Sequence, residues 1–186
     1  INTALSCQVT NTVTVTGAGA ITPPTAGSNS PVCVGGTLNL TSTVVAGATY
    51  AWTGPNTFSS AIQNPSIGSV TAAAGGTYTV VATVGGCTAS ATVVVVINPN
   101  PTVNVPGPIT VCNGANVPLT GFTSTPAGAT YTWTNSNTLI GLGASGSGSV
   151  PAFTATNATA AAISGTITVT PTLAGCVGTP NTYTIT

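Results

Sequence analysis

The sequence contains no Asp, Glu, Lys, Arg or His among its 186 residues. An ordinary soluble domain is about 25% charged, so a chain of this length would carry roughly 46 such residues. General acid–base catalysis uses His, a carboxylate, Lys, Tyr or Cys, and only Tyr and Cys are present. A Ser or Thr nucleophile would have no base beside it, and Ca²⁺ or Mg²⁺ would have no carboxylate ligand. We therefore predict that the chain is not an enzyme and that it needs no cofactor.

The missing cations and the short apolar runs exclude two further kinds of partner. Nucleic-acid binding depends on cationic side chains that release counterions from phosphates, so we predict no nucleic-acid partner. The longest apolar run, residues 93–97, has the length of a strand and lies far below the ~18 residues of a membrane span. We therefore predict no membrane insertion. The absence of a starting Met, a signal peptide and a sorting tail is typical of a section of a longer protein.

The residues that are present favour an all-β fold. Hydrophobic residues make up 42% of the chain, so it can bury a core, and its 23 Gly and 14 Pro favour many short strands and turns. Apolar and polar residues alternate, Thr, Val and Ile are frequent, and no segment has a helical period. The predicted strands are 37–44, 48–53, 77–84, 89–97, 129–134, 166–172 and 181–186.

An internal repeat divides the chain. Cys33 and Cys112 lie 79 residues apart in similar surroundings, and Cys87 and Cys176 lie 89 residues apart, each after a glycine. The longer second offset indicates extra residues in the second unit, around the Gly- and Ser-rich stretch 142–149. A repeat of this length is the size of a domain, which indicates a tandem array of domains rather than a solenoid.

Pro-rich segments mark the predicted domain boundaries. Cys7 and the alternating residues after it match the end of a unit, so residues 1–22 are predicted as the C-terminal strand of a preceding repeat plus a linker. Residues 23–98 and 99–186 are then two full β-sandwich repeats. Because Pro-rich linkers are semi-rigid spacers, we expect an extended array.

Three aromatic residues are predicted to lie in the cores. Trp52 and Trp133 each follow the alternation of a predicted strand, which favours burial over a role as a sugar-stacking platform. The segment 75–79, with Tyr78, resembles the tyrosine corner of immunoglobulin-like sandwiches, and Trp52 resembles their core tryptophan.

A closer resemblance covers nearly the whole chain. Residues 28–41, 52–56 and 63–66 resemble immunoglobulin-like repeats of very large Bacteroidota surface proteins, and residues 150–176 are similar to the PKD-like repeats of those proteins. The resemblance implies export by the type IX system, an extracellular location at the cell surface, and a place in the stalk of an adhesin, including gliding adhesins. The complete lack of charge is a departure from such repeats, which carry scattered Asp, Glu and Lys.

We therefore expect a structural section of a stalk or filament shaft that presents an adhesive tip. The expected partners are neighbouring repeats of the same protein, and uncharged strand edges favour lateral self-association into a fibre. The alternative is a module that itself binds a polysaccharide or a surface. An ice-binding segment, indicated by Thr-x-Thr pairs, is a weaker alternative, since such pairs usually form the solvent face of a strand.

Five cysteines in an exported repeat protein predict disulfides. Pairing within each repeat, Cys33–Cys87 and Cys112–Cys176, is favoured, although immunoglobulin wiring places such cysteines at opposite ends of a sandwich. Pairing across the joints, Cys7–Cys33 and Cys87–Cys112, has similar spacing, and free or otherwise paired cysteines are a third alternative. Cys7 is expected to be unpaired within this chain or to pair outside it. One unit has too few thiols for zinc, so we predict no metal site.

Overall fold

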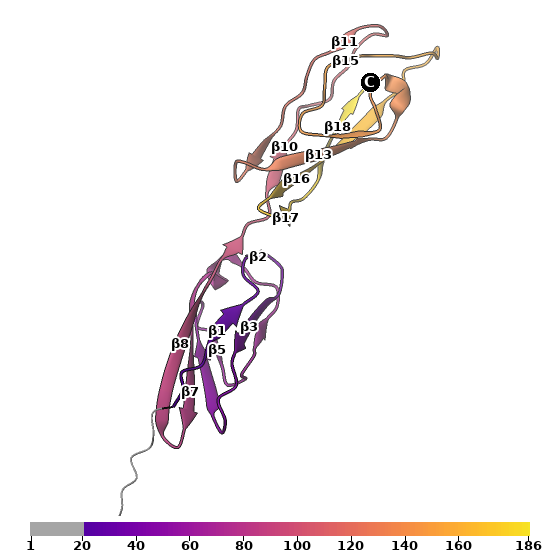
Figure 1. The fold of residues 1–186 in the computed structure, drawn as a ribbon. Helices are drawn as coiled ribbons and strands as arrows, with labels where there is room; N and C mark the ends of the chain where they lie inside the picture. The colour runs from indigo at the N-terminus through magenta and orange to yellow at the C-terminus, as the bar shows by residue number, and fades with distance from the viewer. Residues whose placement is uncertain (1–20) are drawn as a thin grey trace, which may run out of the picture.

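The computed structural model describes residues 21–186, which form two β-sandwiches arranged end to end (Figure 1). The described residues contain strands and two short 3-10 turns, η1 (Ala72–Ala74) and η2 (Thr138–Ile140), but no α-helix. The predicted strand of a preceding repeat and Cys7 lie outside the described residues. Within the described part, no helix is long and apolar enough to cross a membrane.

The first sandwich consists of two antiparallel sheets and one parallel pair of strands. One sheet has the order β1-β3-β6 and the other the order β5-β4-β7-β8, while β2 and β9 pair in parallel at the end that faces the second sandwich. Its strands are β1 (Ala26–Ser28), β2 (Val32–Cys33), β3 (Leu38–Ser42), β4 (Thr49–Thr53), β5 (Ser59–Ser60), β6 (Ser66–Ile67), β7 (Gly76–Val84), β8 (Cys87–Val95) and β9 (Ile97–Asn98).

The second sandwich repeats this order. Its larger sheet runs β14-β13-β16-β17, with β18 also on β16, and the pairs β10-β12 and β11-β15 face it. Its strands are β10 (Thr102–Asn104), β11 (Asn116–Val117), β12 (Thr123–Thr125), β13 (Thr130–Asn135), β14 (Ser145–Ser147), β15 (Phe153–Thr154), β16 (Gly165–Leu173), β17 (Cys176–Val177) and β18 (Asn181–Ile185). The chain is therefore all-β, as the alternation of its residues predicts, and it forms two tandem immunoglobulin-like sandwiches, as the resemblance implies.

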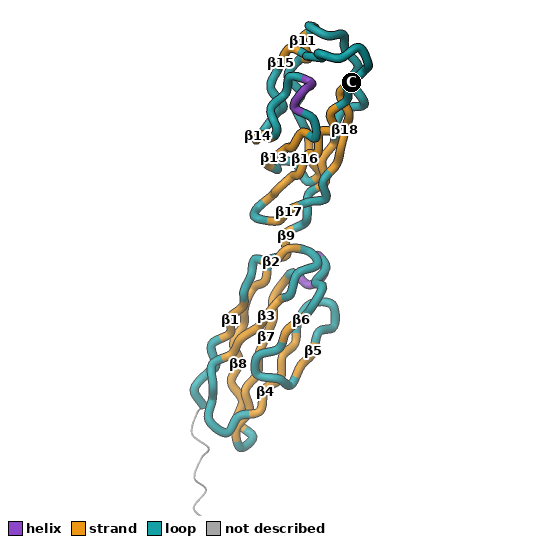
Figure 2. Tube along the Cα trace, turned by 90° about the vertical axis from the view of Figure 1, so that its right-hand side faces the viewer, coloured by secondary structure: helices purple, strands orange, loops and turns teal. Residues whose placement is uncertain are grey.

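Each sandwich has a core of its own. In β3, alternate residues are buried and exposed, so one face of the strand packs inward and the other meets solvent. The first core surrounds Trp52 and Tyr78, and the second surrounds Trp133. The two cores share no residue, so the sandwiches meet only through a narrow joint, which the turned view also shows (Figure 2).

The extra residues of the second unit lie between its central strand and the next edge strand. Trp133 pairs with Gly146, whereas Trp52 pairs with Ser60, so the connection in the second sandwich is longer. This connection contains η2 and adds two buried side chains, Ile140 and Leu142, to the second core. The extra residues therefore enlarge the core of the second sandwich and are not merely an exposed loop.

Candidate functional site

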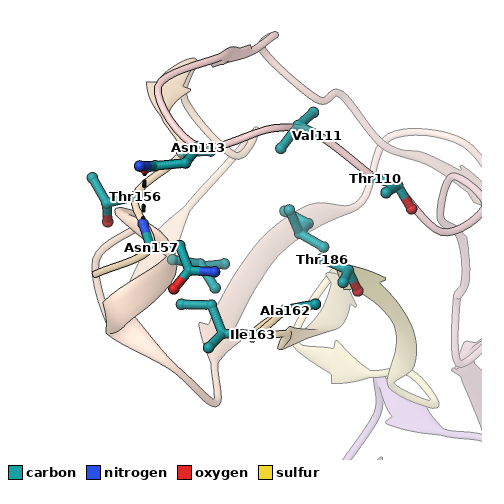
Figure 3. A pocket seen from close by; sticks show the side chains of 11 residues that line it. Thr110, Val111, Asn113, Thr156, Asn157, Ala162, Ile163 and Thr186 are labelled. Atoms are coloured by element: carbon teal, nitrogen blue, oxygen red, sulfur yellow. Dashed lines mark hydrogen bonds between the residues drawn. The ribbon is translucent and has the colours of Figure 1, made fainter. Parts of the chain in front are cut away.

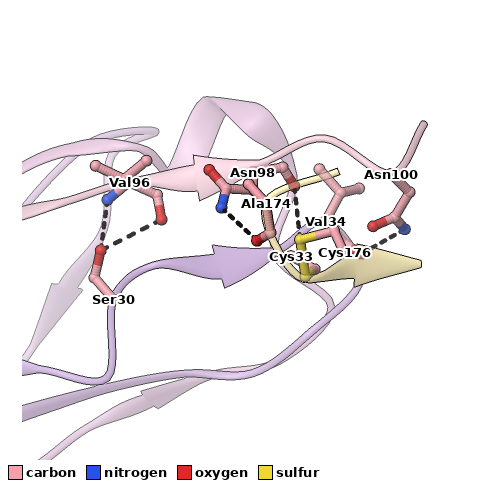
Figure 4. The surroundings of a disulfide bond; sticks show 8 residues. All are labelled: Ser30, Cys33, Val34, Val96, Asn98, Asn100, Ala174 and Cys176. Atoms are coloured by element: carbon pink, nitrogen blue, oxygen red, sulfur yellow. Dashed lines mark hydrogen bonds between the residues drawn. A yellow bond between two sulfur atoms is a disulfide. The ribbon is translucent and has the colours of Figure 1, made fainter. Parts of the chain in front are cut away.

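At the joint between the two sandwiches, residues that are far apart in the sequence form hydrogen bonds and a disulfide. Among residues 21–186, no group of three or more His, Cys, Asp or Glu side chains could hold a metal ion. The joint, by contrast, contains a disulfide, a parallel strand pair and two asparagine side chains that bridge chain segments (Figure 4).

The parallel pair β2–β9 fixes the chain as it leaves the first sandwich. The backbone N–H of Val32 donates to the Val96 carbonyl at 3.1 Å, and that of Val34 donates to the Asn98 carbonyl at 2.9 Å. Ile97, between these bonds, packs against the first core. The chain that leads to the second sandwich is thus held as a strand of the first.

A disulfide joins the two sandwiches directly. Cys33, at the end of β2, is bonded to Cys176, at the start of β17, with Cα atoms 5.6 Å apart and a sequence separation of 143 residues. Cys176 is only 1% exposed. It follows the tight turn of the β16–β17 hairpin, in which Ala174 and Gly175 both have positive φ, at 48° and 81°. This turn presents Cys176 toward the first sandwich.

Two asparagines of the linker add hydrogen bonds to both sandwiches. The Asn100 side-chain amide donates to the Val34 carbonyl at 3.0 Å, and the Asn98 amide donates to the Ala174 carbonyl at 3.4 Å (Figure 4). Because an amide can bond to a backbone carbonyl without any charge, these contacts do not depend on salt.

Close packing of backbone on backbone completes the joint. Pro101 is fully buried, and Gly178 lies so near it that a Cβ at position 178 would collide with the Pro101 carbonyl. The neighbouring residues Thr102 and Thr179 form a parallel bridge. A glycine is therefore required at position 178 for the second sandwich to approach the linker.

The disulfide corrects the sequence-based pairings. Cys33–Cys87 and Cys112–Cys176 are both wrong, and so are Cys7–Cys33 and Cys87–Cys112, because Cys33 is bonded to Cys176 while Cys87 and Cys112 are free. The nine residues of β8 separate Cys87 from the joint by about 30 Å, at ~3.3 Å per residue, and β16 separates Cys112 from Cys176 by a similar length. A disulfide needs Cα atoms within about 7 Å.

The predicted core aromatics lie inside the sandwiches. Trp52 and Trp133 are 1% and 4% exposed, so neither ring is available for stacking on a sugar. Trp52 Nε1 donates to the Gln63 carbonyl at 3.0 Å. Tyr78 is fully buried, and its hydroxyl donates to the Ala74 carbonyl at 2.9 Å, which is the tyrosine corner that the sequence indicates.

The electrostatics of the molecule follow from its composition. The chain holds no carboxylate, ammonium, guanidinium or imidazole side chain, so no side-chain ion pair is available to either sandwich. Burial raises the pKa of the Tyr78 and Tyr183 hydroxyls above the ordinary value of about 10. The joint is accordingly held by covalent, apolar and neutral hydrogen-bonding contacts.

Neither a protein-family model nor a curated protein sequence matches the chain. Among solved structures, an I-band fragment of titin is similar at 12% identity, covering 88% of this chain and 62% of that one, with a TM-score of 0.48. The three N-terminal domains of the outer capsid protein Hoc of bacteriophage RB49 are similar at 16% identity, 88% and 58% coverage and a TM-score of 0.47.

Extracellular domains 3–5 of Drosophila OTK are similar at 14% identity, with 88% of this chain and 59% of that one covered and a TM-score of 0.41. The chain thus spans less than two thirds of the length of each of these three structures. At such identities and TM-scores, the assignment of the fold rests on the strand order described above.

Proposed function

We propose that this chain is a structural section of the stalk of a long extracellular surface adhesin, in which its sandwiches hold an adhesive tip away from the cell. The observation that carries the proposal is the disulfide between Cys33 and Cys176, because it links two successive units across their joint. A spacer needs a fixed distance and direction between units, whereas a binding module needs a ligand site.

The disulfide also changes the path of a pulling force. Force applied along the chain passes from Cys33 to Cys176 through the sulfur atoms, so the 143 residues of separation are bypassed. At roughly 3.4 Å per extended residue, that segment would otherwise lengthen the chain by roughly 480 Å after unfolding. The bypassed segment contains most of both cores, so a stalk built in this way keeps its length under load.

The neutral surface supports a passive role. With no Lys or Arg, the chain has no site for proteases that cut at basic residues, and its contacts hardly respond to salt. Edge strands without charge support lateral association between neighbouring stalks as a further part of the proposal. Val94, on edge strand β8, is 67% exposed, which gives such an association an apolar contact.

The resemblance of the sequence to repeats of Bacteroidota surface proteins supports the remaining part of the proposal. It favours secretion by the type IX system, attachment at the cell surface, a gliding adhesin as one setting, and a role other than catalysis.

Small-angle scattering of the oxidised chain in solution tests the stalk proposal. We expect the curve to fit the single end-to-end arrangement of Figure 1. The double variant Cys33→Ala/Cys176→Ala should require a broader set of arrangements, because only hydrogen bonds and backbone packing then hold the angle between the sandwiches. A flexible pair of sandwiches in the oxidised wild-type chain would contradict the proposal.

A pull-down on insoluble cellulose and chitin tests the alternative, a polysaccharide-binding module. A spacer should remain in the supernatant at 50 mM and at 1 M NaCl alike. Retention on either polymer, competed by soluble fragments of it, would favour the alternative instead.

A further inference from the structure

We propose that the outer end of the second sandwich is a docking site for a following sandwich of the same kind, with Cys112 as its disulfide-forming residue. The inference deepens the proposed stalk function by naming the partner at this end. Features of the joint between the two sandwiches recur at the outer end of the second sandwich.

The backbone of this outer end matches the first half of the joint. The Val111 N–H donates to the Thr186 carbonyl at 2.9 Å, just as the Val32 N–H donates to the Val96 carbonyl at 3.1 Å. Cys112 directly follows Val111, just as Cys33 directly follows Val32, so the two cysteines occupy equivalent positions. In the first sandwich the next residues after Val96 form β9 and run beside Cys33.

The side chain that completes this end of the first sandwich is Ile97, which packs against the first core. At the corresponding place in the second sandwich lies a pocket of about 180 Å³. In Figure 3, Val111, Thr186 and Ile163 lie around this pocket. Its apolar lining includes Ile140 and Ile185 from the second core. Ile97, the residue directly after Val96, fills the first end, so the pocket fits an aliphatic residue directly after Thr186.

The thiols at the two outer ends are complementary. Cys112 is exposed at the outer end of the second sandwich, and Cys87 is free at the tip of the β7–β8 hairpin. Gly85 and Gly86 in that hairpin have positive φ, as Ala174 and Gly175 have before Cys176. The outer end of the first sandwich thus has a hairpin cysteine, Cys87, in the position of Cys176. The outer end of the second sandwich has Cys112 in the position of Cys33.

The bond forms by thiol–disulfide exchange. Cys112 and the hairpin thiol of the following sandwich lose two protons and two electrons, and a disulfide oxidant such as oxidised glutathione is reduced to two thiols. The partner is therefore a sandwich that continues from Thr186 by a segment like residues 97–101 and carries a hairpin cysteine like Cys176.

The test uses the full chain extended after Thr186 by a second copy of residues 97–186 and refolded with oxidised glutathione. Pepsin digestion without reductant, followed by mass spectrometry, should find Cys112 linked to the copy of Cys176 in most molecules. The matched control has Cys176→Ala in the copy only, and there Cys112 should remain open to alkylation while Cys33–Cys176 is unchanged. Cys112 recovered as a free thiol, as a glutathione adduct, or bonded to another cysteine in the extended chain would overturn the proposal.

A shorter extension tests the pocket without requiring a new domain to fold. The full chain is extended by residues 97–101 alone, and its matched control carries Ser in place of the added Ile. With Trp52→Phe in both, the fluorescence of Trp133 reports the second sandwich. We expect the Ile extension to lower the unfolding equilibrium constant of that sandwich tenfold or more relative to the Ser control. Equal constants would overturn the assignment of the pocket. Either failure would leave the scattering test of the stalk proposal unaffected.

Discussion

The two sandwiches share a strand order but stabilise it by different contacts. In the first, the Tyr78 hydroxyl and the Trp52 indole both donate to backbone carbonyls. In the second, the position of Tyr78 is taken by Ile167, which is fully buried, and Trp133 Nε1 is buried with no hydrogen-bond partner within residues 21–186.

The second sandwich has a larger apolar core in place of these hydrogen bonds. Ile140 and Leu142, which the longer connection supplies, pack with Ile167 and Trp133. The comparison shows that one fold tolerates an exchange of polar anchors for buried area, because burial of each aliphatic side chain is worth about 1.5–3 kcal/mol. The joint differs from both cores, since a covalent bond holds it.

The largest expected effect follows from removing that bond. Cys176→Ala should lower the free energy of unfolding by about 5 kcal/mol on the chain-entropy model, since the closed loop spans 143 residues. Calorimetric unfolding of the oxidised wild-type chain and of the variant measures this loss. Cys87→Ala is the control and should leave the oxidised chain unchanged, because Cys87 forms no disulfide.

The second effect tests the polar anchor of the first sandwich. Tyr78→Phe removes the hydroxyl and leaves the buried Ala74 carbonyl unpaired, so the first sandwich should lose about 1–3 kcal/mol. Urea unfolding followed by Trp52 fluorescence in a Trp133→Phe background measures it. If the loss appears in the second sandwich as well, followed by Trp133 in a Trp52→Phe background, the cores are not independent.

A smaller difference separates the two tryptophans. Trp52→Phe and Trp133→Phe remove the same ring volume, but only Trp52 loses a hydrogen bond, to the Gln63 carbonyl. We expect Trp52→Phe to be about 1 kcal/mol more destabilising. Chemical unfolding followed by far-ultraviolet circular dichroism measures both variants, and equal losses would remove this part of the contrast between the sandwiches.

The smallest effect is that of pH. The chain has no carboxylate or imidazole side chain, so the free energy of unfolding should be nearly constant between about pH 4 and 8. Burial raises the folded-state pKa of Tyr78 and Tyr183, so the folded state keeps its protons longer than the unfolded chain. Stability should therefore fall as pH rises above about 10. A steep slope near pH 5 would contradict the account.

The sequence predicts the long strands well but not the contacts at the joint. β7, β8 and β16 have strong alternation, which is local information, and they lie where the pattern places them. The short strands β2 and β9, of two residues each, have too few residues to show a period. Their pairing depends on how the chain leaves the first sandwich.

For a related reason, the sequence does not predict the pairing of the cysteines. Pairing within one repeat assumes that both cysteines of a disulfide belong to the same unit. In the structure, Cys33 of one unit is bonded to Cys176, in a hairpin of the next unit. The conflict with immunoglobulin wiring is a usable signal, because cysteines at opposite ends of one sandwich cannot bond to each other, and a disulfide partner must then lie in a neighbouring unit. Sequence spacing alone does not show which neighbour provides that partner.

Single-molecule stretching of the chain by its two ends tests the central claim, that the Cys33–Cys176 bond carries the load across the joint. The account predicts that the oxidised chain, when fully unfolded, releases roughly 480 Å less contour length than the Cys33→Ala/Cys176→Ala variant, at ~3.4 Å per residue over the 143 bypassed residues. Equal lengths for the two proteins would contradict it.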